Sequence, residues 1–227
     1  QLMETHADFE SKAPSAAGIG TEEVIVVRDL WKAFGANKVL QGFDLTVRRG
    51  ENVMVLGKSG SGKSVLIKCI VGLLQPDKGS ITVLGQDAIS LDSDALDRLR
   101  VKIGFLFQSS ALYDSMTVRE NLEFPLRRHW IAQEGNDSEA LVKEALENVG
   151  LLNAIDMYPS ELSGGMRRRI GLARTLILKP EIVLYDEPTT MVDPIMSSHL
   201  CTLMQRLKKQ LKLTSVIVTH DLDLMEQ

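Results

Sequence analysis

The sequence predicts an α/β fold: a core of mainly parallel sheet with flanking helices, an antiparallel β subdomain and an inserted α-helical subdomain. Three patterns lead to this prediction. Short apolar runs typical of buried parallel strands recur along the chain, at residues 53–56, 103–107, 182–185 and 215–219. Strands with more polar alternation occupy the first third of the chain. After residue 108, a long stretch carries only helical periodicity.

Composition limits the class of protein. The 227 residues are 44% hydrophobic, enough for one large domain or two closely packed lobes. The net charge of −4 is spread out, and the densest basic cluster, at 167–169, is short and is interpreted as a solvated helix face. We therefore expect no nucleic-acid partner. Cys69 and Cys201 lie in apolar helical patterns without metal-ligand spacing, which predicts buried thiols in a reducing compartment.

Domain boundaries are expected as follows. Residues 1–21 lack the basic and apolar regions of a signal peptide and are predicted to form a flexible tail. Residues 22–227 are expected to form a single domain, with its core at 22–108 and 173–227 and the inserted helical subdomain at about 109–172. No stretch approaches the roughly 18 apolar residues of a membrane-spanning helix, so we expect a cytoplasmic chain.

The most informative segment follows the 53–56 strand and fits G-x-x-x-x-G-K-[ST], the phosphate-binding loop. Its residues are Gly57, Lys58, Ser59, Gly60, Ser61, Gly62, Lys63 and Ser64. The glycines let backbone N–H groups point inward, and the predicted helix at 65–74 adds the partial charge of its N-terminus. Lys63 would reach the β- and γ-phosphates, and Ser64 would ligate Mg²⁺. A plain Gly/Ser-rich turn is the alternative; the flanking strand and helix favour the phosphate site.

Before this loop and after it, three short strands suit an antiparallel sheet, at 24–27, 45–47 and 81–84. Phe34 lies about twenty residues ahead of the phosphate loop, where an exposed aromatic ring could stack on a base. Taken alone, a core phenylalanine is the commoner explanation.

Asp92–Asp94 mark a helix start for 95–100, and the strand at 103–107 ends at Gln108. Ligands of parallel sheets gather at the carboxyl ends of strands, so Gln108 could reach a metal or its waters. A strand-ending glutamine is also unremarkable by itself.

The helical stretch ends in a Leu-Ser-Gly-Gly-Met segment, from which a long helix is expected to run from Arg167 to about residue 178. Ser163, with Gly164 and Gly165 behind it, could be an ordinary N-cap or a second phosphate-binding helix terminus. By itself, the cap is favoured.

Two further strands end in polar side chains. After the strand at 182–185, Asp186 is expected to support the Mg²⁺ shell, and Glu187 to orient and polarise the attacking water. His220 follows the strand at 215–219 and could contact the γ-phosphate or hold Glu187 in place. Solvated carboxylates and a structurally satisfied histidine are the alternatives, which the accompanying phosphate loop disfavours for the acids.

In this order and spacing, the motifs resemble those of the ATP-binding cassette (ABC) ATPases, a group of P-loop NTPases, over residues 24–221. The resemblance implies an ATPase that uses ATP and Mg²⁺, with Gln108, Glu187 and His220 as catalytic residues. It also implies that Phe34 stacks on adenine, that Gln108 joins Ser64 and Asp186 at the metal, and that Asp193 belongs to the D-loop.

Cassettes of this family pair head to tail, so the resemblance implies a second copy of the chain as a partner. Each ATP would lie between the phosphate loop of one copy and Ser163, Gly164 and Gly165 of the other, an anion site that opens after hydrolysis. A separate transmembrane permease is the other implied partner, docking on the segment after Gln108.

Within the family, segments 107–127 and 162–169 look most like the Mla-type ATPases. Those work with a permease and a lipid-binding protein to move phospholipid in a bacterial envelope, which implies a peripheral location on the cytoplasmic face of the inner membrane. An ABC importer or exporter for another solute is the alternative. A soluble ABC ATPase is disfavoured because such chains usually carry two cassettes or a long coiled coil. A non-catalytic module is disfavoured by Glu187 and His220.

Overall fold

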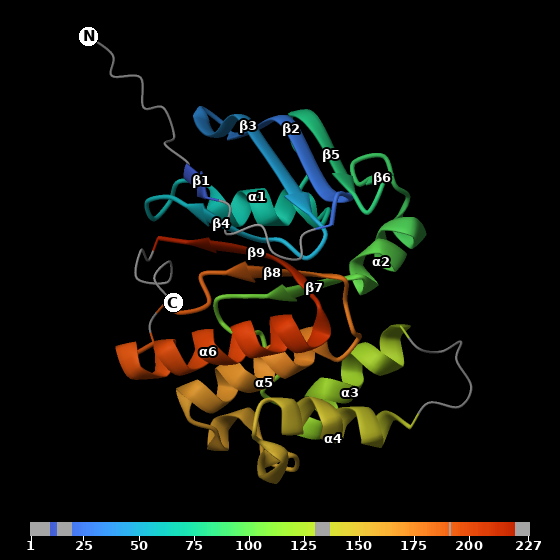
Figure 1. The fold of residues 1–227 in the computed structure, drawn as a ribbon, viewed down its shortest axis with the longest axis vertical. Helices are drawn as coiled ribbons and strands as arrows, with labels where there is room; N and C mark the ends of the chain where they lie inside the picture. Colours follow the sequence, from blue (N-terminus) through green and yellow to red (C-terminus); the bar gives the residue numbers. More distant parts are fainter. Residues whose placement is uncertain (1–9, 13–19, 130–136, 191, 221–227) are drawn as a thin grey trace.

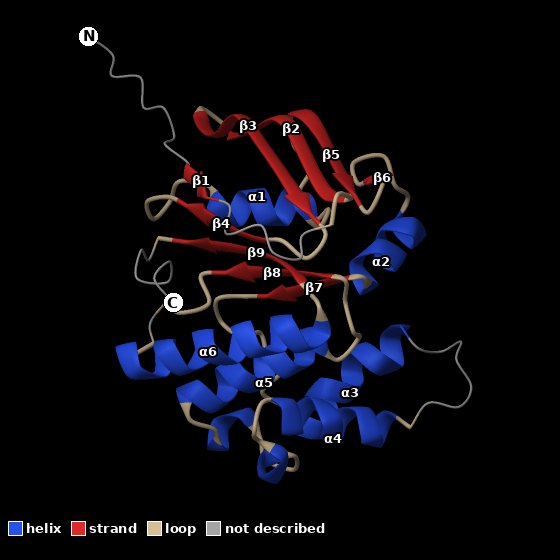
Figure 2. Cartoon of the chain, viewed as in Figure 1, coloured by secondary structure: helices blue, strands red, loops and turns tan. Residues whose placement is uncertain are grey.

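The computed structural model describes residues 10–12, 20–129, 137–190 and 192–220, and it has the predicted α/β organisation. Figure 1 shows the layers: an antiparallel sheet, helix α1 beneath it, the central sheet, and helices α5 and α6 on the opposite face, with α3 and α4 beyond. Figure 2 shows that the strands gather in one half of the molecule and most helices in the other.

The central sheet has the strand order β1-β4-β9-β8-β7. Its parallel strands are β4 (Asn52–Leu56), β9 (Thr214–Thr219), β8 (Ile182–Asp186) and β7 (Ile103–Leu106). Every residue of β8 and β9 is buried, as expected for strands covered on both faces. Because these strands run in one direction, their carboxyl ends meet at a single edge of the sheet.

The fifth strand, β1 (Glu10–Lys12), corrects part of the flexible-tail prediction. It pairs antiparallel with β4, with Glu10 opposite Leu56 and Lys12 opposite Met54. Such pairing satisfies the main-chain groups of an edge strand and depends little on side chains, so hydrophobic periodicity could not reveal it. Residues 1–9 and 13–19 of the expected tail lie outside the described residues.

The second sheet is antiparallel, as predicted, with the order β3-β2-β5-β6. Its strands are β2 (Glu23–Phe34), β3 (Asn37–Arg48), β5 (Lys78–Val83) and β6 (Gln86–Asp87). β2 and β3 are longer than expected because their register shifts between Val27 and Leu30, where Asp29 has a φ of 44°. An irregularity of this kind interrupts the period-two pattern, so only the regular parts are visible in the sequence.

The helices are α1 (Lys63–Ile70), α2 (Ser93–Val101), α3 (Val118–His129), α4 (Ser138–Asn148), α5 (Gly164–Leu176) and α6 (Pro194–Leu211), with 3₁₀ turns η1 (Leu152–Ala154) and η2 (Pro159–Glu161). α1 ends four residues earlier than predicted because Gly72 takes a φ of 68° and the N–H of Leu73 donates to Lys68 O. α5 runs through the expected domain boundary at residue 172, so the core and the helical lobe share this helix.

Two buried hydrophobic clusters stabilise the layers. One includes Leu66 and Ile70 of α1, and the other includes Leu172 of α5 and Leu200 of α6. Cys69 and Cys201 are both buried, as predicted. Among the described residues, no helix combines the length and apolar character needed to cross a bilayer.

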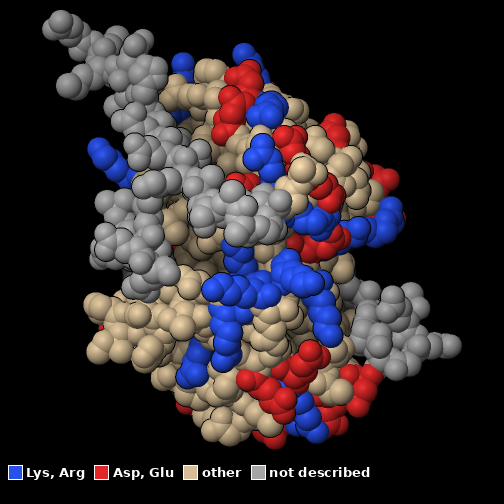
Figure 3. All heavy atoms as spheres, viewed as in Figure 1, with Lys and Arg blue, Asp and Glu red and all other residues tan. Residues whose placement is uncertain are grey.

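Charge is less evenly distributed than the sequence suggested. Figure 3 shows Lys and Arg side chains gathered in a band across the middle of one face, with most Asp and Glu side chains above and below that band.

Candidate nucleotide site

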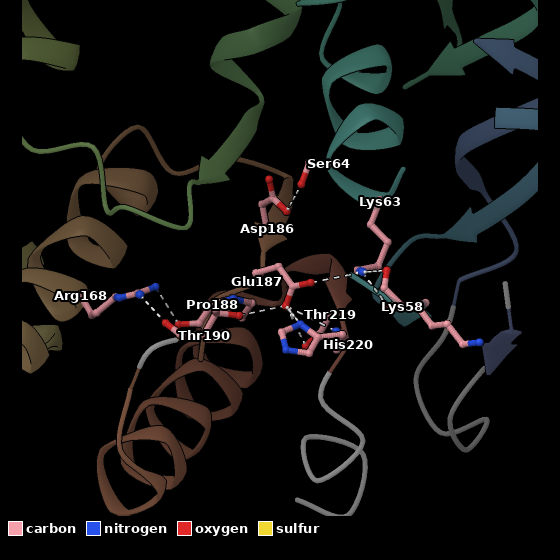
Figure 4. A network of polar contacts seen from close by, with 11 residues as sticks. Lys58, Lys63, Ser64, Arg168, Asp186, Glu187, Pro188, Thr190, Thr219 and His220 are labelled. Atoms are coloured by element: carbon pink, nitrogen blue, oxygen red, sulfur yellow. Dashed lines mark hydrogen bonds and ion pairs between the residues drawn. The ribbon is translucent and has the colours of Figure 1, made fainter. Parts of the chain in front are cut away.

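The phosphate loop, Asp186, Glu187 and His220 meet at the carboxyl edge of the central sheet. The phosphate loop follows β4, the acids end β8, and His220 follows β9 (Figure 4). The pairing of β9 with both β4 and β8 brings these three strand ends together, with Leu56 opposite Thr219 and Asp186 opposite Val218. The fold therefore assembles residues that are up to 163 positions apart in the sequence.

The phosphate loop requires glycine at a defined position. Gly62 has a φ of 101°, and a Cβ there would lie 2.6 Å from Val39 Cγ1 and 3.1 Å from Val39 O. Gly62 is also the N-cap of α1, so the N-cap residue has no side chain with which to cap that helix start. The Ser61 hydroxyl is buried and finds no hydrogen-bond partner among the described residues. An uncapped helix N-terminus beside an unpartnered hydroxyl fits a bound phosphate group.

Lys63 is the buried cation of the site, with only 4% of its surface exposed. Its ammonium group donates to Gly57 O at 2.7 Å and to Lys58 O at 2.9 Å. It also lies 3.3 Å from Glu187 Oε1. A buried ammonium is stable only when paired in this way, so the loop carbonyls and the carboxylate hold the positive charge where phosphate oxygens would be received.

Glu187 is held from several directions. Its Oε2 lies 2.7 Å from His220 Nδ1 and accepts from Thr190 Oγ1 at 3.0 Å. Burial alone would raise the pKa of Glu187, but hydrogen bonds from Thr190 and His220 and the charge of Lys63 bring it below its usual value. The side chain therefore remains an ionised carboxylate, and the contact with it indicates that His220 Nδ1 carries the proton.

The backbone at Glu187 is strained. Its φ is +50°, in the left-handed region, and the next residue is Pro188. Such a conformation costs about 1–3 kcal/mol for a non-glycine residue and persists where the surroundings enforce it, often at functional sites. Here the Glu187 N–H donates to Val218 O at 2.9 Å, which ties the backbone of Glu187 to β9.

Asp186 and Ser64, the two residues expected at the metal, are in contact. Ser64 Oγ donates to Asp186 Oδ1 at 2.8 Å. Burial raises the pKa of Asp186, the Ser64 hydrogen bond lowers it, and the neighbouring Glu187 raises it, for a net increase. Two hard oxygen ligands beside the phosphate loop fit a Mg²⁺ ion that also binds phosphate oxygens and water.

The Leu-Ser-Gly-Gly-Met segment lies in a different environment. Ser163 Oγ accepts from Met166 N at 3.2 Å and so caps α5, while Asp193 Oδ1 accepts from Met196 N at 3.0 Å and caps α6. A cavity of about 490 Å³ is lined by Ser163, Gly164, Gly165, Asp193 and Gln108 among others. The favoured N-cap interpretation of Ser163 is confirmed, and the exposed end of α5 stays available to an anion.

Gln108 is thus placed with the Ser163 segment, and none of its described contacts joins it to Ser64 and Asp186. Its role at the metal remains a prediction. Phe34 is 48% exposed, so the core-phenylalanine alternative is wrong. The ammonium of Lys32 lies 5.6 Å from the centre of its ring, and stacking on adenine likewise remains a prediction.

The basic cluster at 167–169 corrects the sequence interpretation. Only Arg167 is exposed, whereas Arg168 and Arg169 are half-buried, and all three guanidinium groups donate to main-chain carbonyls. Arg168 donates to Pro188 O at 3.0 Å and to Thr190 O at 2.7 Å. The sequence did not predict that Thr190 binds the Glu187 carboxylate or that Arg168 binds the segment after it. Only the spacing of Thr190, three residues after Glu187, gave any signal.

Comparison with known proteins agrees with the site. Residues 40–190 match the family model described as ABC transporter. A probable ribonucleotide transport ATP-binding protein of Mycobacterium tuberculosis is 41% identical over 200 residues, covering 88% of this chain and 55% of the relative. A methionine import ATP-binding protein of Rhizobium johnstonii is 38% identical over 226 residues, covering 99% of this chain and 60% of the relative. The chain spans little more than half the length of these relatives.

Solved structures share the fold. A dimeric bacterial ABC transporter cassette matches with a TM-score of 0.79 and 30% identity, covering 89% of this chain and 90% of that one. A dimeric cassette bound to ADP and Pi in a post-hydrolysis state gives a TM-score of 0.78 and 31% identity, covering 88% and 89%. With the phosphate loop and its carboxylate partners in place on this shared fold, the chain belongs to the ABC transporter family, as one of its ATP-binding cassettes.

Proposed function

We propose that this chain binds and hydrolyses ATP with Mg²⁺ as the nucleotide-binding subunit of a transporter. The observation that carries the proposal is the cluster at the strand edge, where the ammonium of Lys63 lies 3.3 Å from Glu187 and His220 lies 2.7 Å from the same carboxylate. A cation for phosphate, a carboxylate for water and a histidine that holds the carboxylate are the groups that phosphoryl transfer to water needs.

Each residue has a role in this reaction. Lys63 exchanges its carbonyl partners for phosphate oxygens, and Glu187 orients a water molecule and accepts its proton. His220 keeps that carboxylate in position through its Nδ1 proton. Mg²⁺, bound through Ser64 and Asp186, would neutralise charge on the phosphate oxygens. Phe34 and Gln108 are proposed for adenine and for the metal shell, as the family resemblance implies.

Pairing of two copies is proposed from the second half of the site. Ser163 is exposed at the start of α5, and Ile195, two residues after Asp193, is 70% exposed. A helix end that can bind an anion and an exposed apolar side chain at the start of the next helix suit a surface that closes over another copy's ATP. The dimeric cassettes among the solved relatives support this arrangement.

A separate permease is the proposed membrane partner. Phe107, Tyr113, Leu152 and Tyr158 are large exposed hydrophobic side chains in or beside the helical lobe. Exposed apolar side chains of this size suit a protein contact. The chain would then lie on the cytoplasmic face of the inner membrane, held there by the permease.

Two substrates are candidates. Phospholipid is proposed because segments 107–127 and 162–169 resemble the Mla-type ATPases. A different solute is the second candidate, because the two relatives compared above are named for ribonucleotide transport and methionine import.

The test has two parts. Purified protein should release phosphate from Mg-ATP, and Lys63→Ala should weaken nucleotide binding; absence of hydrolysis in the full-length protein with its partners would contradict the proposal. The native complex would then be purified from gently solubilised membranes and identified by mass spectrometry. A permease with a membrane-anchored lipid-binding protein supports phospholipid, whereas a permease with a solute-binding protein supports the second candidate.

A further inference from the structure

The segment that follows the catalytic carboxylate is attached to α5, the helix that Ser163 caps. Arg168, in the second turn of α5, reaches across to residues 188–190 and donates to the carbonyls of Pro188 and Thr190 (Figure 4). The two donors are different nitrogens of one planar guanidinium, at 3.0 and 2.7 Å. A rigid fork of this kind fixes both the position and the direction of the segment it holds.

The segment held by Arg168 is the one that positions Glu187. Thr190, whose carbonyl Arg168 binds, donates its hydroxyl to Glu187 Oε2 at 3.0 Å and its N–H to Glu187 O at 3.3 Å. The contacts therefore run from the guanidinium to Thr190 and from Thr190 to the carboxylate. Pro188, the other carbonyl partner, directly follows Glu187 in the chain.

The contact with Arg168 matters because the backbone at Glu187 is strained. Glu187 has a φ of +50° and precedes a proline, a backbone state that must be imposed by its surroundings. The hydrogen bond from the Glu187 N–H to Val218 O fixes the backbone on the N-terminal side of the residue. The hydrogen bond from Arg168 to Pro188 O fixes it on the C-terminal side. Without the guanidinium, residues 188–190 could relax and the carboxylate would turn away from the attacking water.

The neighbouring arginines do not share this geometry. Arg167 donates to Pro159 O and Leu162 O, and Arg169 donates to Val149 O at 3.3 Å, both within the helical lobe. Arg168 is half-buried, and burial lowers its pKa, so its charge is placed there at a cost.

We propose that Arg168 is a positioning residue for Glu187, acting through Thr190 and Pro188. This inference rests on the proposed ATPase function. Because Arg168 and the Ser163 cap belong to the same helix, any displacement of the α5 N-terminus also moves the guanidinium that binds residues 188–190. Glu187 is therefore aligned by the same helix that presents the second anion site.

The test is steady-state ATP hydrolysis by the full chain in its transporter complex, with Arg168→Ala and the adjacent Arg169→Ala as the matched control. Arg168→Ala should lower kcat by about ten- to a hundredfold, the scale expected for a misplaced catalytic group, while KM for ATP changes by less than about twofold. Arg169→Ala should leave kcat within about twofold of wild type. An unchanged kcat in folded Arg168→Ala would overturn the inference.

A double mutant separates positioning from general destabilisation. If Arg168 acts through Glu187, Arg168→Ala added to Glu187→Gln should lower kcat no further, because the carboxylate it positions is already absent. An additive loss would overturn the inference. Should Arg168→Ala fail to fold, Arg168→Gln serves instead, since its amide is too short to bridge both carbonyls; it should show the same fall in kcat, and a wild-type kcat would overturn the inference.

Failure of the function and failure of the inference are distinguishable. Wild-type protein that hydrolyses no ATP contradicts the proposed function. Hydrolysis that is lost in Glu187→Gln and retained in Arg168→Ala contradicts the positioning role alone.

Discussion

The phosphate loop and the Ser163 segment both lie at helix N-termini that we propose to bind anions, yet their surroundings differ. At the first, Lys63 is buried and already paired with two carbonyls and Glu187. At the second, Ser163 is exposed, caps its own helix and faces a cavity of about 490 Å³.

Glycine packing shows the same contrast. A Cβ at Gly62 would lie 2.6 Å from Val39, whereas a Cβ at Gly164 would meet no atom of the described residues within 4 Å. One proposed anion site is therefore a closed arrangement held by its own chain, and the other is an open surface. The comparison teaches that the first half can be formed by folding alone, whereas the second is suited to completion by another molecule.

The largest effect should come from the closed half. Glu187→Gln removes the carboxylate that accepts the proton, so hydrolysis should fall by about 10²–10⁴ while ATP binding is retained. Phosphate release and equilibrium nucleotide binding would be measured on the same preparation. Normal hydrolysis by this variant would show that another group is the base.

A mixing experiment tests whether the open half works in another chain's site. Lys63→Ala and Ser163→Glu should each lower hydrolysis by about a hundredfold, since each removes a group that stabilises phosphate charge. Mixed together, the two variants should regain activity, because a mixed pair contains one site with intact Lys63 and intact Ser163.

Lys63→Ala mixed with Glu187→Gln is the control for that experiment. Both changes damage the closed half, so no pairing yields an intact site and activity should stay low. Equal recovery in both mixtures would contradict a site shared between chains, as would recovery in neither.

The glycine contrast predicts a difference in stability. Gly62→Ala forces a Cβ against Val39 at a φ of 101° and should cost about 1–3 kcal/mol in the free energy of unfolding. Gly164→Ala, in open space at the first position of α5, should change it by less than about 0.5 kcal/mol. Urea unfolding of the nucleotide-free proteins measures both, and equal costs would remove the distinction between a closed and an open half.

The smallest effect concerns Asp186. Its pKa is raised mainly by burial, so the ionised carboxylate reduces folded-state stability at pH values above that pKa. Asp186→Asn should therefore raise the Tm of the nucleotide-free protein near neutral pH, by on the order of 2–4 °C for each kcal/mol relieved. The gain should shrink as the buffer is acidified and wild-type Asp186 becomes protonated. A Tm gain that grows on acidification would contradict the expectation that the ionised form of Asp186 destabilises the folded protein.

Much of the closed half could be predicted from the sequence because parallel strands deliver their last residues to one edge. The phosphate loop, Asp186, Glu187 and His220 each follow an apolar strand, and their meeting follows from that arrangement. The Ser163 cap was also readable, because a helix start is a local feature.

Other features depend on contacts that leave no pattern in the chain. Arg168 and Pro188 are 20 residues apart, and the direction of a guanidinium on α5 is set by tertiary packing. β1 rests on main-chain pairing, and the shifted register of β2 breaks the alternation on which strand prediction depends. Gln108 was placed correctly at a strand end, but the direction of its side chain was not encoded locally.

The two buried cysteines can report local opening of the protein through the rates at which their thiols are labelled. Cys69 lies on α1 and Cys201 on α6, helices that cover opposite faces of the central sheet (Figure 1). Burial raises the pKa of the Cys69 thiol to about 11. Because thiol reagents react with the thiolate, labelling of Cys69 requires local opening of the structure around α1. The labelling rate of Cys69 would therefore measure how often the α1 face of the central sheet opens, and that of Cys201 how often the α6 face opens. Neither measurement needs an attached probe.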